Sequence, residues 1–201
     1  MTDPLRPLWD FDDLDTTEGR FRALRAEALT QLARVEGLRD RFEEGDRLLD
    51  EIIDEAPRVR IRVDLERGRL RRSSGDKEAA LPLFESAFAA AREAGEDWLA
   101  CDAAHMCALA APDHAGFVAW TNRGIELAES SEAAAYWLGP LLNNLGWELF
   151  DAGEHEQALG LFERALEVRL RDPGNAAAIE HAREAVTEAR RALSRPLGRE
   201  G

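Results

Sequence analysis

The hydrophobic and polar positions of this chain follow the period of an α-helix along almost its whole length. Apolar residues recur on one helical face at 24–33, 48–53 and 159–166. Only residues 59–63 alternate as a β-strand would. That run continues directly into Leu65 and a long polar face, which favours the start of a helix instead. The pattern therefore predicts an all-α protein.

Capping and turn residues divide this pattern into about nine helices of roughly 12 to 19 residues. Residues 15–18 have the form of an N-cap with its reciprocal acid three positions later. The connections between predicted helices are only a few residues long, so consecutive helices should pack as antiparallel neighbours. Because no linker rich in proline, glycine or serine interrupts the series, the sequence predicts one continuous unit rather than two domains.

An internal repeat is the strongest signal in the sequence. Five residues recur with identical types and spacings at a constant offset of 78 positions, which corresponds to two repeats of 39 residues. The first set is Gly68, Gly75, Ala80, Phe84 and Ala87, and the second is Gly146, Gly153, Ala158, Phe162 and Ala165. A degraded copy lies between the two sets, around Cys107, and an earlier copy lies around Gly45. Small residues at fixed intervals predict helical hairpins that approach one another closely.

The repeat resembles the tetratricopeptide repeat. That family has a small residue in the first helix, a glycine-led turn, and then alanine, an aromatic residue and alanine in the second helix. The resemblance covers about residues 20–172 in four copies and is closest at 141–159. The sequence departs from the family where an aromatic residue is usual late in the first helix, since Arg71 and Leu149 stand there.

The resemblance implies a fold and a domain organisation. It implies an all-α, right-handed superhelical solenoid of about four helical hairpins at 16–172, with a concave groove along it. An extended N-terminal segment at 1–15 would precede the solenoid. A polar helix at 173–195 would cap the last repeat, and 196–201 would form a disordered tail.

Composition and charge exclude several classes of function. The chain has 40 acidic and 26 basic residues and a net charge of −14, which disfavours binding to nucleic acid or to an anionic membrane. It has no apolar run of the roughly 18 residues that a membrane helix needs, and its first residues have no apolar signal core. We therefore expect a cytoplasmic protein. Abundant arginine and alanine beside a single lysine resemble the usage of a high-GC bacterial genome.

Catalytic and metal-binding constellations are not evident in the sequence. The four histidines lack the spacing of metal ligands. In a helix, Cys101 and Cys107 would lie about 120° apart around the axis and about 9 Å along it, so they cannot form a disulfide with each other. We expect both to be buried thiols. The sequence accordingly predicts a protein that is not an enzyme and that has no metal or cofactor.

A local excess of arginine suggests a binding surface. Residues 58–72 contain seven arginines against two acids, a local charge of +5 within a chain of −14. In the register that the resemblance implies, several first-helix residues line the groove. They are Arg34, Arg62, Leu65, Arg69, Arg72, His105, Asn143, Asn144 and Trp147. Arginines bind carboxylates in a bidentate manner, amide side chains bond an extended backbone, and tryptophan offers a flat apolar surface.

These features predict a protein–protein interaction module, a scaffold or adaptor whose groove holds a peptide or helix. The partner would carry acidic side chains or a free C-terminus. Two other interpretations remain open at this level. The arginines could serve only to neutralise acidic neighbouring helices. Alternatively, the protein could be a regulatory sensor that binds a small peptide or metabolite in an enclosed pocket near His105 and Trp147.

The N-terminal segment is apolar enough to need a packing partner. It contains Leu5, Leu8, Trp9, Phe11 and Leu14. One interpretation is that the segment covers the exposed end of the first helix pair. The other is that it docks on a second protomer and forms a homodimer.

Overall fold

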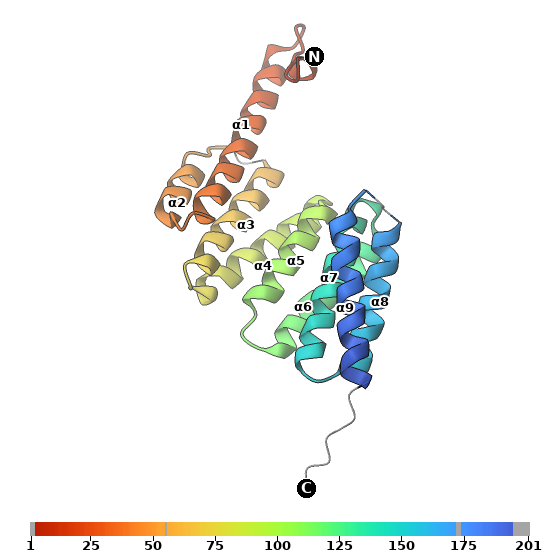
Figure 1. The fold of residues 1–201 in the computed structure, drawn as a ribbon. Helices are drawn as coiled ribbons and strands as arrows, with labels where there is room; N and C mark the ends of the chain where they lie inside the picture. The colour runs from red at the N-terminus through yellow and green to blue at the C-terminus, as the bar shows by residue number, and fades with distance from the viewer. Residues whose placement is uncertain (1–2, 55, 172–173, 195–201) are drawn as a thin grey trace. The chain divides into compact units, whose positions relative to one another are not determined.

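The computed structural model describes residues 3–54, 56–171 and 174–194, and the regular secondary structure in these ranges is helical throughout (Figure 1). The all-α prediction is confirmed, while the predicted tail at 196–201 lies outside the described residues. Nine α-helices and two 3₁₀ helices occur in the described ranges. In chain order they are η1 (Arg6–Leu8), α1 (Leu14–Gly37), α2 (Phe42–Asp50), α3 (Pro57–Ser73), α4 (Lys77–Ala94), α5 (Asp97–Ala110), α6 (His114–Ser130), η2 (Glu132–Trp137), α7 (Leu138–Asp151), α8 (His155–Leu170) and α9 (Ala176–Ser194).

Helix α3 resolves the one ambiguous stretch of the sequence. It begins at Pro57, which occupies the first helical turn, where its missing N–H costs nothing. Residues 59–63 are therefore helical, as predicted. Ile61 and Leu65, which lie one turn apart, are both completely buried. Val59, two positions before Ile61, is buried as well, so α3 buries side chains on more than one side, and this produces the short alternation.

Helix α1 begins earlier than the sequence predicts. Its N-cap is Asp13, whose carboxylate accepts a hydrogen bond of 2.9 Å from the amide of Thr16, so the predicted cap at Asp15 is wrong by two residues. Thr17, which the sequence placed in the cap, is buried. Its hydroxyl instead donates to the carbonyl oxygen of Asp10 at 2.8 Å. This bond fixes the segment before α1 against the first turns of the helix.

The described chain divides into two compact units, with the boundary between Asp113 and His114. In the first unit, α1 packs on α2 and α3, and α3 packs on α4 and α5. The first helices of successive hairpins, α1, α3 and α5, therefore lie next to one another, with α2 and α4 beside them (Figure 1). The boundary falls inside the degraded third copy, where the sequence predicted a continuous unit.

The second unit contains α6, η2, α7, α8 and α9. Helix α7 packs against α6 and α8, and α9 lies along α8 (Figure 1). Small buried residues of α9, including Ala185 and Ala189, contact the Phe162 side of α8. Helix α9 therefore buries part of the surface of α8.

The two best copies of the repeat share one packing contact. Gly68 in α3 faces the ring of Phe84 in α4, and a Cβ atom at Gly68 would lie 2.4 Å from the ring carbon Cε1. Gly146 in α7 faces Phe162 in α8 in the same way, and its Cβ would lie 2.5 Å from Cε1. Both rings are completely buried. The repeated glycines of the sequence therefore mark where two helices of one hairpin touch.

Candidate functional site

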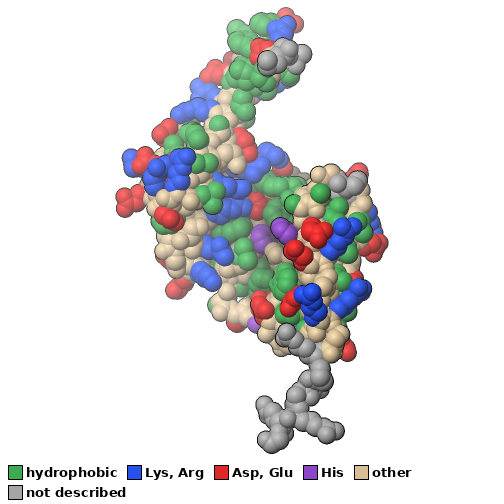
Figure 2. Space-filling view, in the orientation of Figure 1, with side chains coloured by type: hydrophobic (Ala, Val, Ile, Leu, Met, Phe, Trp, Pro, Cys, Tyr) green, Lys and Arg blue, Asp and Glu red, His purple; other side chains and the backbone are tan. Residues whose placement is uncertain are grey.

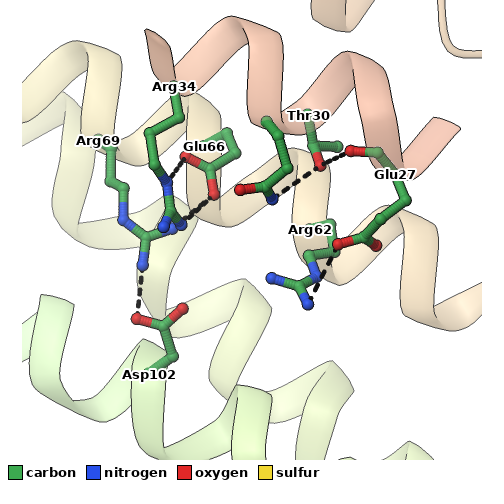
Figure 3. A network of polar contacts seen from close by, with 8 residues as sticks. Glu27, Thr30, Arg34, Arg62, Glu66, Arg69 and Asp102 are labelled. Carbon is green, nitrogen blue, oxygen red and sulfur yellow. Dashed lines mark hydrogen bonds and ion pairs between the residues drawn. The ribbon is translucent and has the colours of Figure 1, made fainter. Parts of the chain in front are cut away.

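Three helices of the first unit bring together a cluster of arginines and acids (Figure 3). Glu66 of α3 receives two guanidinium groups. Arg34 of α1 donates to its two carboxylate oxygens at 2.9 and 2.5 Å, and Arg69 of α3 donates at 2.8 Å. Arg69 also donates to Asp102 of α5 at 2.5 Å. We call these four residues the Glu66 network.

The two acids of the Glu66 network are the buried members. The Glu66 side chain is completely inaccessible and that of Asp102 nearly so, whereas Arg34 and Arg69 are 36% and 17% exposed. A buried carboxylate is stable only when cations and hydrogen bonds replace its water. The guanidinium of Arg34 gains from the same contact, since its hydrogen bond to Glu66 raises the pKa of Arg34. The acids thus fix the positions of two predicted groove arginines.

The role of Asp102 was not recognised from the sequence, although a signal for it existed. Asp102 is the one acidic residue between Trp98 and Ala111, a stretch that is otherwise almost entirely apolar. A single acid in an apolar helix is compatible with burial only if a cation reaches it from another element.

Two predicted groove residues of α3 serve internal packing instead. Leu65 is completely buried, so its prediction as a ligand-contacting residue is wrong. It points away from the surface because α3 turns its Ile61–Leu65 face towards neighbouring helices. The Arg62 side chain is largely buried, pairs with Glu27 at 3.2 Å, and lies over the ring of Trp98 at 5.6 Å. The cation of Arg62 is thereby already occupied.

The local excess of positive charge is largely neutralised within the first unit. Basic and acidic side chains are interspersed over the region of α1 to α3 (Figure 2). Five of the seven arginines between residues 58 and 72 form ion pairs, as the sequence interpretation of charge neutralisation expects. Among the described residues, Arg60 and Arg72 have no carboxylate within ion-pair distance.

A pocket of about 240 Å³ lies over the Glu66 network, and Arg72 forms part of its wall. Within the described ranges, Arg72 makes one long hydrogen bond, 3.4 Å from Nε to the carbonyl oxygen of Leu109. The lining combines the charged groups with apolar side chains. Its residues are Arg34, Gly37, Leu38, Glu66, Arg69, Leu70, Arg72, Ser73, Met106 and Leu109. We call this the arginine pocket.

His105 of α5 lies near the arginines of this pocket and is partly buried. Burial lowers the pKa of His105, and the positive charges of Arg69 and Arg72 lower it further, while Asp102 opposes them. At neutral pH the imidazole is therefore uncharged. His105 adds polarity to this side of α5 but no positive charge.

The remaining predicted residues belong to the second unit. Asn143 and Asn144 are half-buried on α7, and Trp147 is 37% exposed. The indole of Trp147 packs against the rings of Phe150 and Phe162, with centroids 5.4 and 4.9 Å away. Trp147 therefore lies partly exposed beside two aromatic rings, in a different compact unit from the arginine pocket.

The cysteines and the potential metal ligands of the described residues are the candidates for reactive or metal-binding groups. Cys101 and Cys107 are both buried, as predicted, and burial raises the pKa of Cys101 to about 12, so its thiol remains protonated at neutral pH. No cluster of three potential metal ligands occurs in the described ranges. Within the same ranges, every helix is too short or too polar to cross a bilayer.

Comparison with known proteins places this fold. Residues 141–171 match the family model of the tetratricopeptide repeat. Among solved structures, BtubC (BKLC) from P. vanneervenii is similar with a TM-score of 0.64 and 18% identity, over 90% of this chain and 86% of that one. The nearly identical TPR-like repeats of a putative kinesin light chain from Podosopora anserina give a TM-score of 0.55 at 17% identity, over 84% and 92%. A crystal structure of a single-residue variant of these repeats has a TM-score of 0.60 at 16% identity, over 84% of this chain and 86% of that one.

A search of curated proteins finds no match. The matched segment begins at Leu141 and contains the Gly146–Phe162 contact, which the Gly68–Phe84 contact repeats in the first unit. The family match, the solved structures and this duplicated contact lead to one conclusion: residues 141–171 form a tetratricopeptide repeat, and the chain has a fold of the tetratricopeptide-repeat type.

Proposed function

We propose that this protein is an interaction module that binds an acidic segment or a free C-terminus of a partner protein in the arginine pocket. Tetratricopeptide repeats in general mediate protein–protein interaction. The single observation that carries the proposal is the position of Arg72, a cation without a carboxylate partner in the part of the chain that the structure describes, in the wall of a pocket.

The charge balance of the pocket favours an anionic guest. Arg34, Arg69 and Arg72 contribute three positive charges, and Glu66 and Asp102 contribute two negative ones. One carboxylate from a partner would therefore complete the neutralisation. The Glu66 network holds two guanidiniums in place before binding, so fewer side chains need to be ordered on association.

The apolar part of the pocket favours a peptide over an inorganic anion. Leu38 is strongly exposed at one side of the pocket, and Met106 and Leu109 lie on α5 at another. Apolar side chains next to a carboxylate on the partner would bury against these residues, and such contacts supply most of the affinity of an interface.

Charge reversal at Arg72 tests this function. The probe is an array of random decapeptides with free C-termini, with the same sequences amidated as a second set. We expect the wild-type protein to retain peptides rich in aspartate or glutamate, or ones with a free carboxylate. We expect Arg72→Glu to reduce that retention at least tenfold, because the one uncompensated cation of the pocket becomes an anion.

Arg60→Glu is the matched control, since Arg60 lies on the same helix, is exposed and also has no ion pair within the described ranges. An equal loss of peptide retention in Arg60→Glu and Arg72→Glu would show a general effect of net charge and would contradict the proposal. Reversal of Arg62 or Arg69 is a poorer test, because these arginines neutralise Glu27 and the buried acids, and their loss would disturb the fold itself.

We also propose that the N-terminal segment joins two copies of the chain. Trp9 stacks on Phe11 with centroids 5.3 Å apart and meets Phe21 of α1 edge-on at 5.4 Å, so the segment folds onto the first turns of α1. The N-terminal part of α1 extends beyond α2 and α3 (Figure 1). The outer faces of Leu5, Trp9, Phe11 and Leu14 remain exposed by 44% to 64%. A cluster of large exposed apolar side chains is a common feature of an interface.

The variant Trp9→Ser/Phe11→Ser tests the dimer. We expect sedimentation equilibrium to give a dimer mass for the wild-type protein and a monomer mass for the variant at the same concentration. The double variant Leu193→Ser/Leu170→Ser, which removes two exposed leucines elsewhere, should leave the mass unchanged. A wild-type protein that remains monomeric at high micromolar concentration would refute the dimer and leave the peptide proposal unaffected.

A further inference from the structure

A second pocket lies within the second unit, far along the chain from the arginine pocket. It has a volume of about 340 Å³ and is formed where η2 and the start of α7 meet the end of α8 and the start of α9. Its walls are mainly apolar. The lining includes Tyr136, Leu138, Pro140, Val168 and Ala178, together with two arginines, Arg169 and Arg171. Its volume falls within the range of small-molecule sites, which are typically apolar with a few polar groups.

Arg169 is a charged group of this pocket that has no counter-charge among the described residues. Its Nη1 donates to the carbonyl oxygen of Ala178 at 2.6 Å. Among the residues that the structure describes, no carboxylate lies within ion-pair distance of its guanidinium. Burial lowers the pKa of Arg169, and the electrostatic interaction with Tyr136 opposes this shift. A partly buried guanidinium of this kind favours an anion supplied by a ligand.

The neighbouring Arg171 differs from Arg169 in that it forms an ion pair with an acid on its own helix. Arg171, two residues further on, pairs with Glu167 one turn back at 2.8 Å, and both side chains are largely exposed to solvent. Glu167 therefore compensates Arg171 and not Arg169. Both arginines line the pocket, but within the described ranges only Arg171 has an acid within ion-pair distance.

Gly139 gives the stem of Arg169 the space to reach the pocket. A Cβ atom at Gly139 would lie 3.3 Å from both Cγ and Nε of Arg169, a tight contact. The guanidinium consequently sits against the start of α7, beside the apolar walls of Leu138, Pro140 and Val168. A cation adjoining an apolar cavity matches a ligand that is anionic at one end and apolar at the other.

We propose that this pocket binds a small carboxylate with an apolar body, an arylalkanoate or a medium-chain aliphatic acid, through Arg169. The carboxylate accepts hydrogen bonds from the guanidinium, and the apolar body packs against Leu138, Pro140 and Val168, with Tyr136 at the side. This site is separate from the arginine pocket and does not depend on the proposed peptide binding.

The test uses 3-phenylpropionate and its neutral amide, 3-phenylpropionamide, which have nearly the same shape. Isothermal titration with the full chain should show binding of the acid at least tenfold tighter than of the amide. In ¹H–¹⁵N spectra, the shifts should be confined to residues 135–140, 168–171 and 174–178. Equal affinity for the two compounds, or no binding of either, would overturn the proposal.

Two variants and one control separate the roles of the lining residues. Arg169→Gln should remove the preference for the acid. Arg171→Gln, a change at a second lining arginine whose charge is already paired with Glu167, should preserve it. Because Arg169→Gln also loses the bond to Ala178, Tyr136→Ala provides a second variant at a side chain that is 66% exposed and so dispensable for folding. Tyr136→Ala should weaken the acid and the amide by a similar factor of about three to ten. The proposed site would be refuted if Tyr136→Ala bound 3-phenylpropionate as tightly as the wild type and a folded Arg169→Gln still preferred the acid over the amide.

Discussion

Replacement of Glu66 by glutamine should lower the free energy of unfolding by about 3 kcal/mol, because it breaks a buried ionic network on one side. In the wild-type protein the carboxylate of Glu66 accepts hydrogen bonds from Arg34 and Arg69. Glutamine retains the size of the side chain, but its amide group would present N–H donors to guanidinium donors. Two cations would then share one neutral acceptor in a site closed to water. Urea denaturation followed by circular dichroism measures this change in the free energy of unfolding.

Glu44→Gln is the matched control for this prediction. Glu44 also pairs with an arginine, Arg47, but both side chains are largely exposed. Exposed pairs contribute little, so the expected loss is below about 0.5 kcal/mol. A loss for Glu66→Gln as small as that of the control would show that the Glu66 network does not stabilise the first unit.

Gly146→Ala should destabilise the second unit by about 2 to 3 kcal/mol, although alanine is the better helix former. The added methyl group would lie 2.5 Å from Cε1 of Phe162, a ring with no exposed surface, and the ring has no free space into which to move. Gly68→Ala should have the same effect on the first unit through Phe84, because the contact is duplicated there. Thermal or urea unfolding measures both effects.

Gly160→Ala is the control, and its effect on the free energy of unfolding should have the opposite sign to that of Gly146→Ala. Gly160 lies inside α8, two residues before Phe162, and a Cβ atom there would meet nothing within 4 Å. Alanine should therefore stabilise the helix by up to about 1 kcal/mol. In addition, Phe162→Leu combined with Gly146→Ala should cost less than the sum of the two single changes, because the smaller side chain leaves room for the methyl group. Additive losses would exclude the steric explanation.

The sequence alone determined the repeated architecture of this protein. Helical periodicity and short connections predicted an all-α fold. The offset of 78 residues between Gly68 and Gly146 located two equivalent hairpins. These signals are local and steric, since a helix face must be apolar where it packs, and only glycine allows a buried phenylalanine ring to lie against the backbone. For the same reason the fourth copy, at 141–171, was recognisable without coordinates.

The tertiary structure alone decided which charges are available. The sequence showed a run of arginines, but not that Glu27 lies opposite Arg62 or that Asp102 reaches Arg69 from another helix. Pairing of charges depends on which helix faces meet. A lone acid in an apolar helix, such as Asp102, signals that some cation must reach it, but the sequence does not tell which residue more than thirty positions away supplies that cation. The same holds for Arg169, whose lack of an acidic neighbour among the described residues could not be seen in a chain with 40 acids. Charge composition is a sum over the chain, whereas an ion pair depends on a distance of a few ångströms.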